Sequence, residues 1–161
     1  MKKYIFLTIL LVAIIILLII GNKSISTEII INTSAENIWN ELTNFEKYPE
    51  WNPFIRKVSG NIAVGNKIEV TFQTEGSNPI VFTPIIQKID NNSIFQWEGR
   101  LLMPGIFTGK HTFQLVSIDK NKTKLIQKEE FNGILVSFFN FDSTIKGFGL
   151  MNKSIKERLE K

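Results

Sequence analysis

The chain of 161 residues contains no cysteine and only one histidine, His111. The absence of cysteine excludes disulfide bonds, a thiol nucleophile, a cysteine-ligated metal and a lipid-modified N-terminal cysteine. A single histidine leaves little room for a histidine-built zinc site. Phosphate-binding glycine loops and nucleophile elbows are also missing from the sequence. We therefore expect no metal and no cofactor, and the sequence assigns no catalytic residue.

An excess of charge of either sign is missing as well. The chain has 19 Lys and Arg against 15 Asp and Glu, and the basic residues are spread along it without a run. Two of them, Lys2 and Lys3, precede an apolar N-terminal segment, so the rest of the chain is close to neutral. Proteins that bind nucleic acid need a basic patch, and we predict no nucleic-acid partner.

One long apolar run is present, at residues 4–20, and Thr8 alone interrupts it. At about 1.5 Å per residue it forms a helix of roughly 25 Å, close to the ~30 Å hydrocarbon core of a bilayer. The run therefore predicts an N-terminal transmembrane helix, with an anchor at 1–22 and a domain at 24–161. A cleaved secretory signal and a buried soluble helix are the alternatives. The residues after the run lack the small-x-small pattern that signal peptidase requires.

The position of the basic residues predicts an orientation in the membrane. Lys2 and Lys3 precede the run, and Lys23 follows it closely. Positive charge favours the cytoplasmic side, so we expect a single-pass protein of the cell membrane with a cytoplasmic N-terminus. The domain then faces outward.

The remaining sequence alternates strand patterns with turn residues and ends in a helical pattern. A short amphipathic helix around residues 35–42 follows the first strand pattern, and a helical stripe of period three to four fills the C-terminal segment 134–161. The strand patterns cover residues 24–31, 55–59, 67–74, 80–89, 93–101, 108–118 and 123–131. Hairpin-like spacing predicts one curved antiparallel sheet of seven strands. The fold class is α+β, with the long C-terminal helix covering the sheet.

Aromatic residues are abundant, with 13 Phe and 3 Trp. Chains of this kind either build a dense core or line an apolar cavity. A curved sheet that grips a helix encloses a space that these side chains can line.

Several segments resemble the START-related superfamily of birch-pollen-allergen-like proteins and polyketide cyclases/dehydratases, also called SRPBCC proteins. The resemblance spans roughly residues 27–160, and the run Tyr48-Pro49-Glu50-Trp51-Asn52-Pro53-Phe54 carries it most specifically. Further segments in the same order are residues 35–39, 58–60, 95–99, 111–113, 129–133 and 147–152. The resemblance implies a helix-grip fold with a deep hydrophobic cavity between sheet and helix. It does not imply one activity, because this superfamily includes carriers, hormone binders, cyclases and hydrolytic enzymes.

Strand alternation predicts which side chains face that cavity. Residues two apart share a face, so His111, Gln127 and Glu129 are its polar contacts. A His–Glu pair can orient a ligand hydroxyl or carbonyl or transfer a proton, and the two side chains can also simply bond each other. The full set of predicted ligand contacts is Phe95, Trp97, His111, Phe113, Gln127, Glu129, Phe131 and Phe148. Trp51, Phe54 and Phe107 are predicted at the cavity mouth.

These features support three hypotheses on function. The first is a membrane-anchored carrier or sensor that binds a small hydrophobic molecule, such as a lipid-, isoprenoid- or polyketide-like compound. The second is a cyclase- or dehydratase-like enzyme that uses His111 and Glu129 as acid and base. The third is an envelope domain that contacts another protein.

Overall fold

The structure is a computed structural model that describes residues 2–74 and 76–161, except for the side chains of residues 17–20. The helices are α1 (Lys2–Ile20), α2 (Ala35–Thr43), α3 (Tyr48–Trp51) and α4 (Asp142–Leu159), with short 3-10 turns η1 (Phe45–Lys47) and η2 (Val136–Phe138). The strands are β1 (Asn22–Ile31), β2 (Ile55–Ser59), β3 (Glu69–Phe72), β4 (Ile80–Phe82), β5 (Ile85–Asp90), β6 (Ile94–Leu101), β7 (Phe107–Asp119) and β8 (Lys122–Asn132). The α+β class is confirmed.

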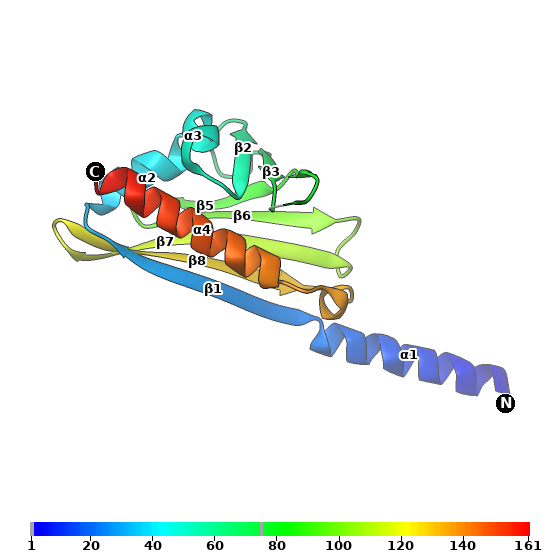
Figure 1. Cartoon of the computed structure of the whole chain (residues 1–161). Helices are drawn as coiled ribbons and strands as arrows, with labels where there is room; N and C mark the ends of the chain where they lie inside the picture. Colours follow the sequence, from blue (N-terminus) through cyan, green and yellow to red (C-terminus); the bar gives the residue numbers. More distant parts are fainter. Residues whose placement is uncertain (1, 75) are drawn as a thin grey trace.

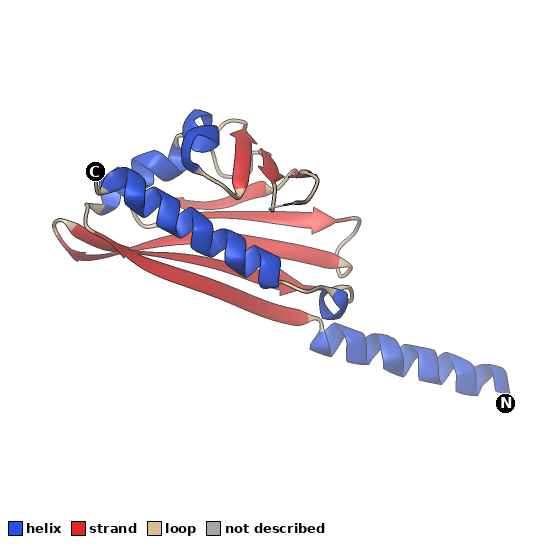
Figure 2. Ribbon diagram, in the orientation of Figure 1, coloured by secondary structure: helices blue, strands red, loops and turns tan. Residues whose placement is uncertain are grey.

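A five-stranded antiparallel sheet in the order β1-β8-β7-β6-β5 forms the centre of the molecule. Its strands β6, β7 and β8 follow one another through tight connections, and β1 closes one edge beside β8. Helix α4 lies across one face of this sheet (Figures 1 and 2). Helix α2 lies near the C-terminal end of α4, and α3, β2 and β3 lie along one side of it, above α4 in Figure 1.

The prediction of one seven-stranded sheet is wrong, because the chain forms separate sheets of five and three strands. The expected strand at residues 80–89 is interrupted at Thr83–Pro84, which divides it into β4 and β5. Ile68 donates its N–H to the Pro84 carbonyl at 3.0 Å, but proline has no N–H with which to return the bond. Val70 lies opposite Phe82 and Lys67 opposite Ile85, so the register continues across this break.

The C-terminal helix is shorter than the predicted 134–161, because α4 begins at Asp142. The preceding residues are held in a loop by backbone bonds to the connection between β6 and β7. Ile134 donates to Gly105 O at 3.0 Å and Leu135 to Ile106 O at 3.1 Å. These bonds keep the segment before α4 out of an α-helix, and it forms only the short 3-10 turn η2.

Helix α4 packs against the loop before β2 closely enough to require glycine at position 147. A β-carbon there would overlap the ring of Phe54, and Phe148 beside it is fully buried. Gly149, two residues on, faces open space. Close packing therefore requires glycine at position 147, whereas no neighbouring atom requires it at position 149.

A buried chain of polar side chains also joins α4 to the sheet. Gln127 on β8 donates to Asn152 Oδ1 on α4 at 2.6 Å and to the Phe148 carbonyl at 3.3 Å. Asn152 in turn donates to Thr27 Oγ1 on β1 at 3.1 Å. Gln127 and Asn152 are almost wholly buried, so these bonds fix the rotation of α4 over the sheet.

Helix α1 extends away from the rest of the protein (Figure 1), and its described side chains are exposed. Over the described residues, no helix combines the length and the apolarity needed to cross a membrane. The predicted transmembrane helix is thus not supported. The side chains of residues 17–20, at the end of the predicted span, lie outside the described part.

The two glycines of α4 predict opposite effects of alanine. Gly147→Ala should lower the free energy of unfolding by about 1–3 kcal/mol, because the added methyl group overpacks against Phe54. Gly149→Ala should raise it by roughly 0.5–1 kcal/mol, because alanine is the better helix former and meets no neighbour. Denaturant unfolding of the full chain measures both, and equal shifts would contradict the close packing of α4.

The polar tie between α4 and β8 predicts non-additive substitutions. Gln127→Leu and Asn152→Leu should each cost about 1–3 kcal/mol, since each leaves a buried partner unpaired. The double variant should cost less than the two combined, by at least about 0.5 kcal/mol. Asn132→Ala, in an exposed amide pair with Asn22 at 2.7 Å, is the control and should change stability by no more than about 0.5 kcal/mol. If the stability costs of the two single variants simply add in the double variant, the two side chains are not energetically coupled.

Candidate functional site

The face of the five-stranded sheet that meets α4 carries the predicted ligand contacts. Alternate residues of β6, β7 and β8 are buried there, as the strand alternation predicts. Trp97 lies opposite His111 in the β6–β7 pair, and His111 lies opposite Glu129 in the β7–β8 pair. The structure therefore places these three side chains side by side across neighbouring strands.

His111 is at the centre of this face, and its side chain is 2% exposed. Its ring stacks on Trp97, with centroids 5.0 Å apart and an angle of 16° between the rings. Phe113 and Phe148 meet it edge-on at 4.5 Å and 4.9 Å. Among the described residues, its Nε2 atom has no hydrogen-bond partner. An imidazole nitrogen is thus buried unpaired within an aromatic enclosure.

Glu129 contacts the other nitrogen of the same ring. Its Oε2 lies 3.6 Å from His111 Nδ1, and its side chain is 17% exposed. Gly109 on β7 makes room for this carboxylate, because a β-carbon at that position would lie 2.8 Å from Glu129 Oε1. At 3.6 Å the two atoms are beyond hydrogen-bond distance. The negative charge on the Nδ1 side nevertheless favours the neutral tautomer with its proton on Nδ1, in which Nε2 is an acceptor.

Gln127 supplies a second unpaired atom on this face. Its Nε2 donates to the Phe148 carbonyl, which can only accept, and this fixes the orientation of the amide. Its Oε1 is then left buried without a partner among the described residues. Asn152 and Thr27 complete the polar group, and the sequence analysis did not assign them to the site. An asparagine within the apolar stripe of α4 was the available signal.

The other predicted contacts lie at the two ends of the inner face. Phe95 packs on Trp97, Trp39 and Phe45, whereas Phe131 stacks on Phe141 with centroids 4.1 Å apart. The three residues predicted at the mouth, Trp51, Phe54 and Phe107, are all buried. Phe54 packs against Phe148, Phe107 against Phe131, and Trp51 against Tyr48.

Aromatic side chains enclose His111, and the two hollows described next do not reach it. Two hollows formed by described residues have volumes of about 560 Å³ and about 420 Å³. The larger lies at the end of the sheet near the start of β1, and the smaller lies beside the C-terminal end of α2. Of the predicted ligand contacts, Phe131 alone lines either of them.

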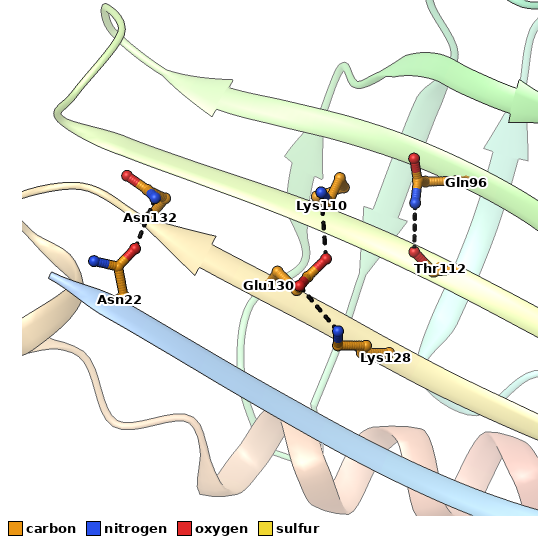
Figure 3. A network of polar contacts seen from close by, with 7 residues as sticks. All are labelled: Asn22, Gln96, Lys110, Thr112, Lys128, Glu130 and Asn132. Carbon is orange, nitrogen blue, oxygen red and sulfur yellow. Dashed lines mark hydrogen bonds and ion pairs between the residues drawn. The ribbon is translucent and has the colours of Figure 1, made fainter.

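The opposite face of the sheet is polar and carries exposed ion pairs. Glu130 pairs with Lys128 at 2.9 Å and with Lys110 at 3.3 Å (Figure 3). The hydrogen bond from Lys128, followed by that from Lys110, lowers the pKa of the Glu130 carboxyl. Glu98 and Arg100 form a further pair at 2.8 Å on β6. Over residues 2–74 and 76–161, no group of three or more His, Asp or Glu side chains is placed to hold a metal ion.

Solved structures with this arrangement of helices and strands come from several kingdoms. Major latex-like protein 151 from Panax ginseng has a TM-score of 0.71 at 12% identity, over 88% of this chain and 99% of that one. The Zhui aromatase/cyclase from Streptomyces sp. R1128 has a TM-score of 0.68 at 11% identity, over 86% and 94%. A START superfamily protein from Mycobacterium smegmatis has a TM-score of 0.65 at 20% identity, over 85% and 97%. These likenesses show a shared fold.

The sequence gives a family as well as a fold. No protein of curated function matches it, but residues 23–160 match a family described as polyketide cyclase / dehydrase and lipid transport. The matched segment runs from the start of β1 to the residue after α4, so it includes every side chain of the inner face. The superfamily resemblance is thereby confirmed, and the chain belongs to the polyketide cyclase / dehydrase and lipid transport family.

Proposed function

We propose that this protein binds a small, largely apolar molecule that carries a hydroxyl group, between the sheet and α4. The observation that carries the proposal is the pair of unpaired polar atoms on the inner face, His111 Nε2 and Gln127 Oε1. The family description, which includes lipid transport, supports a ligand of this class.

The chemistry of the two atoms favours a hydroxyl group over a carbonyl. In the tautomer that the charge of Glu129 favours, the proton is on Nδ1 and Nε2 accepts a hydrogen bond, and the amide oxygen of Gln127 can only accept. Each unpaired buried acceptor costs about 1–3 kcal/mol in the folded protein. A ligand hydroxyl that donates to either acceptor recovers part of this cost, whereas a carbonyl cannot donate at all.

The surrounding side chains favour an apolar ligand body. Trp97, Phe113 and Phe148 enclose His111, and their rings contact each other or the imidazole. A ligand must therefore displace a ring, and Phe148 is the candidate because it comes from α4 rather than from the sheet. Binding then requires a change in the Phe148 side chain or a shift of α4.

The cellular setting stays a prediction of the sequence. Location at the cell membrane and an outward-facing domain rest on the apolar run at residues 4–20 and on the lysines beside it. The third hypothesis, a domain that only contacts another protein, is consistent with the filled interior. It does not explain why two polar atoms are buried unpaired.

Substitutions on the two faces of the sheet test the binding proposal. Native mass spectrometry of the purified full chain should show a bound apolar compound. His111→Phe and Gln127→Leu should each lower its occupancy about threefold or more, because a lost hydrogen bond costs roughly 0.5–1.5 kcal/mol. Gln96→Ala, on the outer face beside Trp97, is the matched control and should leave occupancy unchanged. Equal occupancy in all three variants would exclude the inner face as the site.

A second candidate function is a cyclase- or dehydratase-like reaction. The specific observation is the His111–Glu129 pair, in which a carboxylate oxygen lies 3.6 Å from Nδ1 while Nε2 is buried without a hydrogen-bond partner among the described residues. Nε2 in this state can remove a proton from a carbon next to a ligand carbonyl and return it to a departing hydroxyl. The imidazole acts first as base and then as acid, and water leaves.

A turnover measurement distinguishes an enzymatic function from a carrier function. If the protein is an enzyme, the bound compound should lose water or cyclise on incubation, which mass spectrometry detects. His111→Phe should then slow turnover by roughly 10²–10⁴-fold, while Glu129→Gln should slow it less because the base itself remains. A compound that is released chemically unchanged by the wild-type protein would leave the carrier as the function.

A further inference from the structure

The hollow of about 560 Å³ is separate from the interior around His111 and is lined mainly by polar side chains. It lies where the outer face of β6, β7 and β8 meets the first residues of β1 and the loop after β6. Asn22, Lys23 and Ser24, which follow directly after α1, form one of its walls. Pro104 and Phe131 supply its apolar part.

Cationic groups outnumber carboxylates around this hollow. Lys23, Arg100 and Lys110 line it together with two carboxylates, those of Glu98 and Glu130. Each carboxylate is neutralised by a neighbour: Glu98 pairs with Arg100, and Glu130 is shared between Lys110 and Lys128 (Figure 3). Three cations thus line the hollow with two carboxylates, and the balance favours an anion.

Hydroxyl and amide groups add neutral hydrogen-bond donors to the same walls. Thr108 and Asn132 lie opposite each other on β7 and β8, and both line the hollow. Asn132 bonds Asn22 across β8 and β1 (Figure 3). An anion with several oxygens can accept from both the cations and these groups, as phosphates and carboxylates do.

The loop beside the hollow presents apolar side chains to solvent. Leu102 is 83% exposed and Met103 is 64% exposed, and Pro104, the next residue, lines the hollow. Leu102 has a φ of 65°. This left-handed conformation is unfavourable for a leucine, and residues held in it against their preference concentrate at functional sites. The loop thus holds an apolar surface at the rim of a cationic hollow.

We propose that this hollow binds the anionic head group of an amphiphile, a phosphate or a carboxylate, whose apolar chain lies against Leu102 and Met103. The cations and donors of β1, β6, β7 and β8 hold the head group, and the loop after β6 covers the start of the chain. Apart from Lys23 and Phe131, which lie opposite each other in the β1–β8 pair, the lining comes from the outer face and the loop after β6. Neither His111 nor Gln127 lines the hollow, so the site does not depend on the proposed function. A lipid head group and a free amphiphilic anion share this chemistry.

Calorimetric titration of the full chain in neutral maltoside micelles tests the site with three probes. These are inorganic phosphate, hexyl phosphate and a short-chain phosphatidylglycerol, each corrected for empty micelles. Hexyl phosphate should bind more tightly than inorganic phosphate, and more weakly as salt increases. Tighter binding of phosphatidylglycerol than of hexyl phosphate identifies a lipid as the source, and the reverse order identifies a free amphiphile.

Matched variants locate the binding. Lys23→Gln with Arg100→Gln should weaken hexyl phosphate about tenfold at low salt, whereas Lys57→Gln with Lys88→Gln, two cations outside the hollow, should have no effect. Leu102→Ser with Met103→Ser should weaken hexyl phosphate and leave inorganic phosphate unchanged. His111→Phe should change neither. The proposal is overturned if the Lys23 and Arg100 variant binds like the wild type, or if hexyl and inorganic phosphate bind equally.

Discussion

The packing of α4 on the inner face of the sheet is the contact on which the rest of the structure depends. Gly147 lets the helix approach Phe54, and the chain from Gln127 through Asn152 to Thr27 fixes its rotation. Both features act where the helix and the sheet carry their largest buried side chains. Because hydrogen bonds as well as apolar contacts fix its rotation, the helix has one preferred orientation on the sheet. Any molecule that enters between the two layers must work against that position.

This arrangement accounts for an interior in which aromatic rings pack closely while two polar atoms lack hydrogen-bond partners. Aromatic rings surround His111, while its Nε2 and the Gln127 Oε1 remain unpaired. A core selected for stability alone would leave neither acceptor without a donor, since unpaired buried polar groups destabilise the folded state. Their presence among buried aromatic side chains is the reason to regard the face as a binding surface. The family, which includes lipid transport, is in agreement.

Much of the fold could be predicted from the sequence, because strand alternation and turn residues are local signals. The set of inward-facing side chains that includes Trp97, His111 and Glu129 could be predicted because alternate residues of a strand share a face. The split of the sheet did not, because it depends on the one bond that Pro84 cannot return to Ile68. Likewise, backbone hydrogen bonds to the connection between β6 and β7 hold the loop before α4. The spacing of apolar residues cannot predict such contacts between distant segments. The filling of the interior depends on rings that come from different elements, and only their three-dimensional positions reveal it.

The central claim is that ligand binding occurs at the inner face, and the single histidine allows a direct measurement. Nitrogen-15 NMR of the full chain reports one imidazole, that of His111, and so separates the interior from any lipid bound to the exposed helix α1. Organic solvent removes the bound compound from the protein. The protein is then refolded and titrated with the compound in that solvent extract. The account predicts that the Nε2 resonance moves as the extract is added, and that Gln127→Leu reduces the change. An Nε2 resonance that stays unchanged while the extract binds would contradict the account.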